Sequence, residues 1–301
     1  MTEFISTHAG EMAALGTAIC FTVNSITFEA AGKKIGSLSV SYLRLFIAFI
    51  LLSINAFFSR GLIFPTDATA NNWIWLLLSG LFGFVLGDLF LFEAFVQIGS
   101  RISMLIMSVA PPLTALLGFL ILNEKLSLLS LVGMGLNILG ISLVILSRGG
   151  EEKKVQFNRP VKGIIFACLG AVGQASGLIL SKIGMGSYNP LAAVQIRIIA
   201  AAIGYTIIII YRHKWQEIRD ALKNKRALWE LFLGSVTGPY LGVVLSQVAL
   251  QFTEAGIVSS ISSISPILII PASIVLFKEK VLPKEILGAF ISIAGVLLLF
   301  L

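Results

Sequence analysis

One apolar pattern occurs twice along this chain, at a constant separation of 155 residues (Gly87 to Gly242). The stretches Gly87–Leu146 and Gly242–Leu301 align without a gap, and each is mostly apolar over lengths that match a bilayer. Aligned pairs include Ala94 with Ala249, Ser108 with Ser263, Pro111 with Pro266, Gly133 with Gly288 and Gly140 with Gly295. Membrane proteins built from two homologous halves commonly hold a substrate pathway between them, so the duplication predicts transport.

The composition supports a chain whose solvent is mostly lipid. Of 301 residues, 57% are hydrophobic and 12% are charged, and the mean hydropathy is +0.96. A soluble domain carries about twice that charged fraction. The net charge of +7 comes from basic residues in short loops between apolar runs. This pattern is typical of membrane orientation, so we expect a lipid bilayer around the chain and no nucleic-acid partner.

Few residues are available for metal, redox or nucleophilic chemistry. Cys20 and Cys168 lie inside apolar runs, and the only histidines are His8 and His213. No G-x4-G-K-[ST], H-E-x-x-H or G-x-S-x-G sequence occurs, which argues against direct ATP use and against an intramembrane hydrolase. We expect no metal, no cofactor and no enzymatic activity. The leading hypothesis is a secondary carrier, and the alternatives are an intramembrane enzyme and a non-transporting membrane partner or sensor.

Apolar runs of about 20 residues predict ten transmembrane helices. The fold class predicted is an all-α integral membrane protein, with a first repeat over residues 1–147, a polar linker over 148–161 and a second repeat over 162–301. Five spans per repeat is an odd number, so the two repeats are expected to be inverted in the membrane. The basic loop Arg212–Arg226 is expected to form a short surface helix. The expected spans are 11–31, 39–58, 73–97, 102–122, 128–147, 162–183, 190–211, 227–251, 255–277 and 283–301.

The loops differ sharply in basic charge. Those after the first, third, fifth, seventh and ninth spans hold seventeen Lys and Arg residues, whereas the opposite side holds only Arg60 and Lys125. The positive-inside rule then places the basic loops in the cytoplasm and both termini outside. The expected location is the cell membrane, with many passes. The sequence leaves a monomer and a homodimer equally open.

The repeat resembles that of the EamA family in the drug/metabolite transporter superfamily. The family pattern is an Ala, a mid-span Pro, a Gly-Glu-Arg-like turn and a Gly-x6-Gly span. The resemblance implies a ten-helix carrier, often an exporter of amino acids or other small metabolites, with both termini usually in the cytoplasm. That orientation is opposite to the one the charge count predicts. The residues that carry the resemblance are Ala94, Pro111, Asn123-Glu124-Lys125, Gly133 and Gly140, repeated as Ala249, Pro266, Lys278-Glu279-Lys280, Gly288 and Gly295.

Ionisable residues inside apolar spans are candidate functional groups, because a charge in hydrocarbon is costly. Asp88 lies near the centre of the third span and is the leading candidate for proton coupling, followed by Glu93 and Glu29. The alternative is that Asp88 simply pairs with Arg44 or with a neighbouring backbone group. Arg44, Lys182 and Arg197 stand where the family has basic residues. Lys182 and Arg197 could attract an anionic group or could extend to the membrane interface.

Uncharged polar residues within the spans are candidates for a substrate cavity or for contacts between helices. These residues are Asn24, Gln174, Ser176, Tyr240 and Gln247, and with Asp88 they form the predicted cavity set. Pro111 and Pro266 are expected to break their helices and shape the site, or to be fixed kinks. Glycines at three- and four-residue spacing are expected to pack helices closely, and their smooth faces could slide during transport: Gly80, Gly83, Gly87, Gly170, Gly173, Gly177, Gly234, Gly238 and Gly242.

Overall fold

The computed structural model describes residues 8–98, 106–147, 161–265, 267–268 and 282–300. This part of the chain is helical apart from its connecting turns. Within it, six helices are long and apolar enough to cross a membrane, and shorter apolar helices accompany them. The six are Ala9–Gly32, Ser37–Arg60, Ala70–Leu91, Val161–Met185, Pro190–Tyr211 and Lys225–Phe252.

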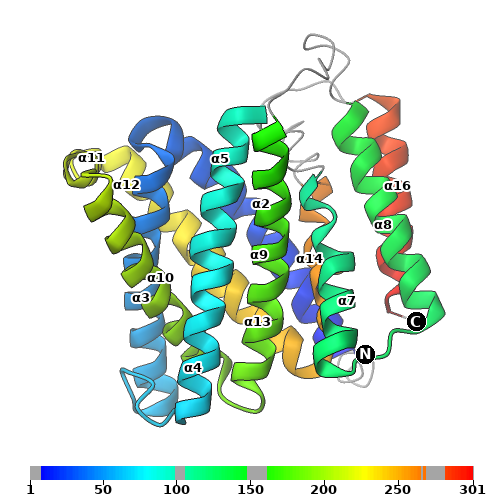
Figure 1. The fold of residues 1–301 in the computed structure, drawn as a ribbon, viewed down its shortest axis with the longest axis horizontal. Coiled ribbons are helices and arrows are strands. Elements are labelled where there is room, and N and C mark those ends of the chain that lie inside the picture. Colours follow the sequence, from blue (N-terminus) through cyan, green and yellow to red (C-terminus); the bar gives the residue numbers. More distant parts are fainter. Residues whose placement is uncertain (1–7, 99–105, 148–160, 266, 269–281, 301) are drawn as a thin grey trace.

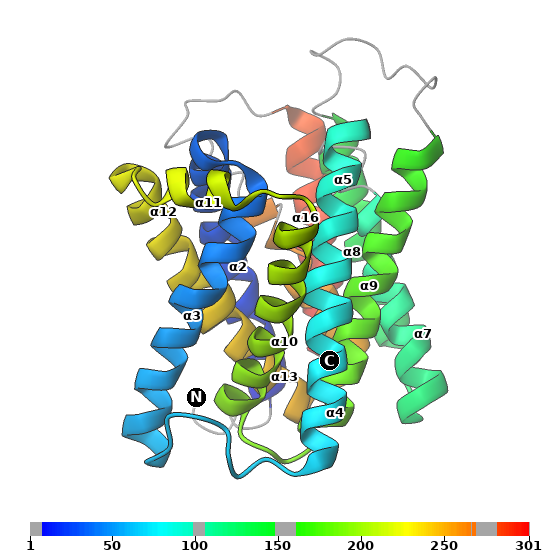
Figure 2. The same cartoon turned by 60° about the vertical axis from the view of Figure 1, so that its left-hand side comes forward.

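The helices form a bundle whose long axes run in broadly the same direction (Figures 1 and 2). The first residues of α2 and the last residues of α16 lie toward the end of the bundle opposite the short helix α11. The helix predicted in the basic loop is confirmed as α11. The elements are α2 (Ala9–Ile35), α3 (Ser37–Arg60), α4 (Ala70–Ser79), η1 (Gly80–Gly87), α5 (Asp88–Ile98), α7 (Ala110–Leu122), α8 (Leu128–Ser147), α9 (Val161–Met185), α10 (Pro190–Tyr211), α11 (Trp215–Ala221), α12 (Lys225–Ser235), η3 (Val236–Gly242), α13 (Val243–Phe252), α14 (Ala255–Ser262) and α16 (Pro283–Leu298).

Local sequence signals set several helix ends. Thr69 begins α4 with a capping box that it forms with Asn72, and Asn189 caps α10 directly before Pro190. The α7 helix ends at Asn123, which adopts the left-handed conformation with φ of 55°. Asparagine is the residue that best replaces glycine in that conformation. This accounts for Asn123 where the family turn more often has glycine.

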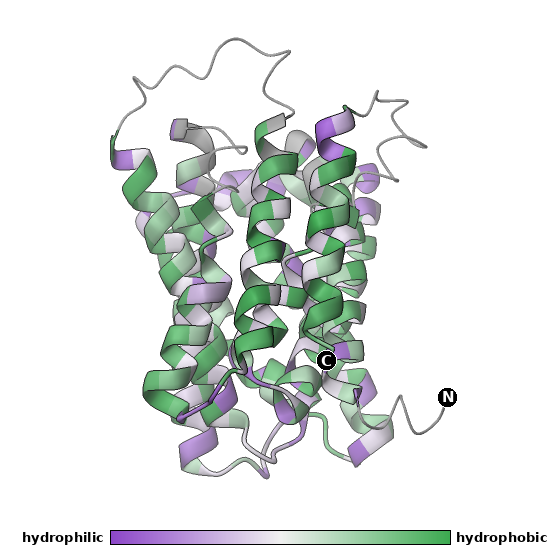
Figure 3. Cartoon of the chain, turned by 90° about the vertical axis from the view of Figure 1, so that its right-hand side faces the viewer, coloured by the Kyte–Doolittle hydropathy of each residue, from purple (hydrophilic) through white to green (hydrophobic). Residues whose placement is uncertain are grey.

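The helices are mostly hydrophobic along their middle parts, and hydrophilic residues gather toward their ends (Figure 3). Large apolar side chains such as Phe58, Phe119 and Phe290 are more than half exposed. An apolar belt of this extent would be unstable in water, whereas lipid solvates it. The described part of the chain is therefore that of a multi-pass membrane protein.

Four helices are irregular at positions that correspond between the two copies of the repeat. The π-helices η1 and η3 interrupt the third and eighth spans. The predicted fourth span has a turn at Ser108–Val109, and the predicted ninth span has one at Ser263–Ile264. Pro111 therefore lies in the first turn of α7, and the break falls just before it. The proline lacks an N–H for the carbonyl four residues earlier and its ring clashes with that carbonyl. Pro266 lies outside the described residues.

Glycines bring the two halves into backbone contact at two places. On the α9 face toward η1, a Cβ built on Gly177 would lie 2.6 Å from the Cα of Gly83, and one on Gly173 would lie 2.9 Å from the Cα of Gly87. In lipid such close packing is a main source of helix association. The predicted packing role of these glycines fits the structure, and the contact places Gln174 beside the third span.

Candidate functional site

A cavity of about 390 Å³ lies in the interior of the bundle and is lined from both copies of the repeat. Its volume falls within the range of small-molecule sites. The walls come from α2, α3, η1, α5, the start of α7, α8, α9, η3, α13 and α14 with the turn that follows it. All four irregular helix segments contribute lining residues, namely Phe84, Ser108, Pro239 and Ser263. Broken helices at the middle of the bundle are where carriers commonly bind their solutes.

One side of the cavity carries a charged group of three residues, here called the charged corner: Arg44, Asp88 and Gln174. Arg44 Nη2 forms an ion pair with Asp88 Oδ2, and Gln174 Nε2 donates to Asp88 Oδ1 at 2.9 Å. Both ion-pair side chains are mostly buried, with 13% and 12% of their areas exposed. The π-helix η1 ends just before Asp88, and Gly87 leaves room for Gln174 to approach. The charged corner thus depends on α3, α5 and α9 together.

A second arginine lies behind this corner. Arg197 is 5% exposed, and its guanidinium carbon lies 4.6 Å from the ring centroid of Phe84, which faces the cavity. Within the described residues Arg197 has no carboxylate partner of its own. Arg44 and Arg197 therefore lie inside the bundle rather than at a membrane interface, because both are held by groups of the third span.

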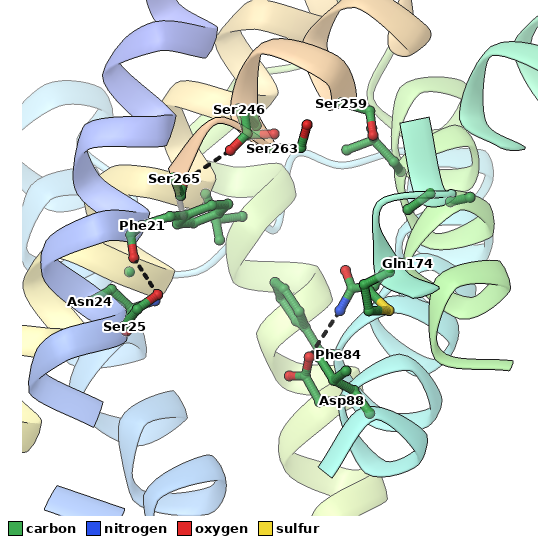
Figure 4. Close-up of a pocket in the computed structure, with 18 of the residues that line it drawn as sticks. Phe21, Asn24, Ser25, Phe84, Asp88, Gln174, Ser246, Ser259, Ser263 and Ser265 are labelled. Carbon is green, nitrogen blue, oxygen red and sulfur yellow. Dashed lines mark hydrogen bonds between the residues drawn. The ribbon is translucent and has the colours of Figure 1, made fainter. Parts of the chain in front are cut away.

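The other side of the cavity is rich in hydroxyl groups. Five serines from α13, α14 and the turn after α14 form what we call the serine wall: Ser246, Ser259, Ser262, Ser263 and Ser265. Figure 4 shows Asn24 and Ser246 across the cavity from Asp88 and Gln174. Phe21 and Phe84 add aromatic surface. The site can therefore bind a small solute that has both polar and apolar parts.

The structure brings together some of the predicted site residues. Asn24, Asp88, Gln174, Arg44 and Pro111 all line the cavity.

Other predicted residues lie elsewhere. Ser176 is two positions from Gln174, about 200° around α9, so it does not line the cavity. Tyr240 accepts a hydrogen bond from Asn55 Nδ2 at 2.6 Å. Gln247 accepts one from Ser181 at 2.6 Å.

The remaining candidate carboxylates do not line the cavity in the described structure. Glu93 accepts a hydrogen bond from Gln97 on its own helix, at 3.2 Å. The side chain of Glu29 lies outside the described residues. Asp88 is thus the one carboxylate among the described cavity-lining residues. In the same part of the chain, no group of three or more His, Cys, Asp or Glu side chains could hold a metal ion.

Lys182 belongs to a separate polar cluster, one turn of α9 beyond Leu178 at the edge of the cavity. Lys182 Nζ lies 2.6 Å from Glu124 Oε1 and donates to the backbone oxygen of Thr253 at 2.6 Å. The other carboxylate oxygen of Glu124 accepts from the backbone N–H of Ala255 at 3.0 Å, at the start of α14. This Lys182 cluster joins α9 to the turns that follow α7 and α13. The Thr253 hydroxyl also donates to Glu11 at 2.6 Å, so the cluster lies at the end of the bundle where α2 begins.

Sequence reasoning missed the serine wall and the two π-helices. The alignment of Ser108 with Ser263 was a signal for part of the wall, since both residues line the cavity. The spacing of Gly80, Gly83 and Gly87 marked the η1 segment, but only as a packing face. Serines carry little weight in a hydropathy pattern, so the other four were not distinguishable from ordinary span residues.

These features define a multi-pass membrane protein with a polar cavity enclosed by two copies of one helical unit. Residues 8–146 and 161–301 each match the EamA-like transporter family. The chain belongs to this family, and is a membrane transporter of the drug/metabolite transporter superfamily.

This chain is also similar to a second protein over nearly its whole length, and to a solved structure in its fold. A protein described as an uncharacterized transporter, from Archaeoglobus fulgidus, is 24% identical over 293 residues, which cover 95% of this chain and 96% of that protein. A solved crystal structure of another protein has a TM-score of 0.79 and 14% identity, over 96% of each chain. The latter likeness shows a shared fold.

Proposed function

We propose that this protein is a secondary carrier that exports small polar or amphipathic metabolites, amino acids among them, across the cell membrane. The observation that carries the proposal is the cavity itself: it is polar, large enough for a small solute, and lined by both copies of the repeat. Nothing in the proposal requires a cofactor or an enzymatic reaction. The partners are the bilayer and the solute, and the functional unit is a monomer or a homodimer.

The carrier is proposed to consist of ten spans in two inverted five-helix repeats, over residues 1–147 and 162–301, joined by the linker 148–161. The helix contacts support this arrangement. The α9 helix packs on η1 and on α7, as α2 packs on η3 and on α14. The α10 helix packs on η1, as α3 packs on η3. Equivalent helices also meet each other in the pairs α8 with α16, α7 with α14 and α3 with α10. Each of these contacts therefore has an equivalent when the two repeats are exchanged, which supports the proposed arrangement.

The carrier is proposed to work by alternating access. The Lys182 cluster supports this, because it ties together helices of both repeats at one end of the cavity. Opening that end requires Lys182 to leave Glu124 and the backbone oxygen of Thr253. The basic loop Arg212–Arg226 lies at the other end of the bundle. By the positive-inside rule, that end is proposed to face the cytoplasm.

Asp88 is the proposed site of proton coupling, because its carboxylate faces the cavity. In the described structure it is paired with Arg44 and bonded to Gln174. Proton uptake at Asp88 would therefore require the ion pair to open first. Glu93 and Glu29 are the next candidates.

Transport by purified protein in proteoliposomes tests the proposal directly. We expect uptake of at least one compound from a labelled set of amino acids and other small metabolites, driven by a pH gradient. Asp88→Asn keeps the shape of the side chain but removes its titration. This variant should lose accumulation against a gradient by at least tenfold while it keeps counterflow exchange. Empty liposomes are the control. Absence of uptake for every compound would refute the carrier, and normal accumulation by Asp88→Asn would make Asp88 structural.

A further inference from the structure

The two copies of the repeat place corresponding residues in the cavity, but with different chemistry. At five pairs of aligned positions, both members line the cavity. In three of these pairs the first copy has an apolar residue and the second has a serine: Leu91 with Ser246, Met107 with Ser262 and Ala110 with Ser265. A fourth pair, Ser108 with Ser263, has a serine in both copies. At three equivalent positions the first copy therefore presents an apolar group to the cavity and the second copy a hydroxyl group.

The two copies of the repeat also differ in the charge that they place in the cavity. Asp88 of the first copy aligns with Val243 of the second, and both line the cavity. The carboxylate of the charged corner therefore has no counterpart at the corresponding position on the other side. A solute that enters this cavity meets a carboxylate from the first copy and five serines from the second, whereas the first copy contributes two serines, Ser25 and Ser108. Such a cavity favours one orientation of an asymmetric solute.

Four polar groups of the cavity lack a hydrogen-bond partner within the described residues. The Oδ1 atom of Asn24, the Nε atom of Arg44 and the hydroxyl of Ser262 are buried and unpartnered. No hydrogen bond involving the Ser246 hydroxyl is found in the same part of the chain. By contrast, Ser263 donates to the backbone oxygen of Ser260 at 2.7 Å, and Ser265 donates to that of Ala18 at 3.0 Å. A buried polar group without a partner is unfavourable unless a bound molecule satisfies it.

We propose that Ser246 and Ser262 determine the specificity of the carrier, by hydrogen bonding to a hydroxyl or amide group of the solute. The substrate class is a small solute with an ionic group at one end and a hydroxyl or amide at the other. Its ionic group lies at the charged corner formed by Arg44, Asp88 and Gln174. This inference rests on the proposed carrier function and adds the chemistry of the solute.

Pairs of nearly isosteric amino acids test this inference, because the members of each pair differ by a hydroxyl. The pairs are threonine with valine, serine with alanine and tyrosine with phenylalanine. In proteoliposomes, the wild-type protein should take up the hydroxylated member of at least one pair with a KM about three- to tenfold lower, as loss of one hydrogen bond predicts. The Ser246→Ala/Ser262→Ala variant should lose this preference and still transport the member without the hydroxyl. Ser235→Ala is the matched control, because this buried serine does not line the cavity and its hydroxyl donates to the backbone oxygen of Leu231 at 2.7 Å. This variant should keep the preference.

Two results would overturn the inference. The first is a wild-type protein that transports these pairs without preferring any hydroxylated member, or that transports none of them. The second is a preference that survives in the Ser246→Ala/Ser262→Ala variant. In both cases, uptake of any other compound from the metabolite set would still support the proposed carrier function. The two proposals can therefore fail separately.

Discussion

The Arg44→Ala variant is expected to lose about 3–5 kcal/mol of unfolding free energy, because it leaves the Asp88 carboxylate buried beside the cavity without its ion-pair partner. Asp88 would keep its hydrogen bond from Gln174 at 2.9 Å, which cannot replace a full positive charge. The Arg44→Ala/Asp88→Asn double variant should recover part of the loss, because no buried carboxylate is left without its partner. The recovery should be incomplete, because Arg197 stays buried and loses the nearby negative charge of Asp88. Equilibrium unfolding in mixed micelles, arranged as a double-mutant cycle, measures the coupling between the two residues.

An exposed ion pair provides the control for this cycle. Lys214 pairs with Glu217 on the surface, with 45% and 50% of their side-chain areas exposed. Lys214→Ala should change the unfolding free energy by less than about 1 kcal/mol, because water screens such pairs. If Arg44→Ala costs no more than Lys214→Ala, the charged corner does not stabilise the fold. The role of Arg44 would then be to bind the solute and not to stabilise the fold.

The Gly140→Leu variant is expected to separate α8 from α16 and to abolish transport. A Cβ on Gly140 would lie 2.5 Å from the backbone oxygen of Gly288, and one on Gly295 would lie 2.5 Å from the backbone nitrogen of Asn137. These contacts are with backbone atoms, so the helices must move apart to admit a side chain. Gly140→Ala alone should cost about 1–3 kcal/mol through overpacking.

Gly135 on the same helix is the matched control. A Cβ there meets nothing within 4 Å, and alanine has a higher helix propensity than glycine. Gly135→Ala should therefore be neutral or slightly stabilising, by thermal denaturation in detergent. Equal melting temperatures for Gly135→Ala and Gly140→Ala would contradict the close contact between α8 and α16.

The sequence predicted the helical class and the position of most spans. It also predicted three of the residues that line the cavity, Asn24, Asp88 and Gln174. Asp88 was favoured over Glu93 because it lies nearer the centre of the third span. Five residues correspond to roughly 140° around a helix, so the two side chains were not expected to line one narrow cavity equally. In the structure Asp88 lines the cavity and Glu93 bonds to Gln97. The pairing of Asp88 with Arg44 was one of two open readings, because residues 44 positions apart cannot be placed side by side by periodicity.

Other features needed the three-dimensional arrangement. Gly133 and Gly140 were recognisable as a repeat signature, but nothing in their spacing indicated that they face Gly288 and Gly295 across α8 and α16. The break in the fourth span was predicted at Pro111 and lies at Ser108–Val109, because a proline disturbs the turn before it. The Lys182 cluster joins three separate parts of the chain, namely the end of α9 and the turns that follow α7 and α13. Such contacts follow from packing between repeats and leave no local pattern.

The central claim is that the cavity opens to one side of the membrane at a time. Thiol labelling of Ser259→Cys tests it, in a variant whose Cys20 and Cys168 are replaced by serine, because Ser259 lines the cavity. An impermeant reagent is applied to intact cells and to inverted vesicles. Gln216→Cys in α11 serves as the marker for the side of the basic loops, and should label only in inverted vesicles if that side is cytoplasmic.

The decisive comparison adds Lys182→Ala to the Ser259→Cys protein, with Lys125→Ala as the control from the same turn as Glu124. Loss of the Lys182 cluster should raise the labelling rate from the side opposite the basic loops at least fivefold. It should lower the labelling rate from the basic-loop side at least twofold. In alternating access, each molecule that opens on one side is closed on the other, so a larger population of one open state means a smaller population of the other. Lys125→Ala should change neither rate. Labelling that rises on one side without falling on the other would indicate a continuous pore, and would contradict alternating access.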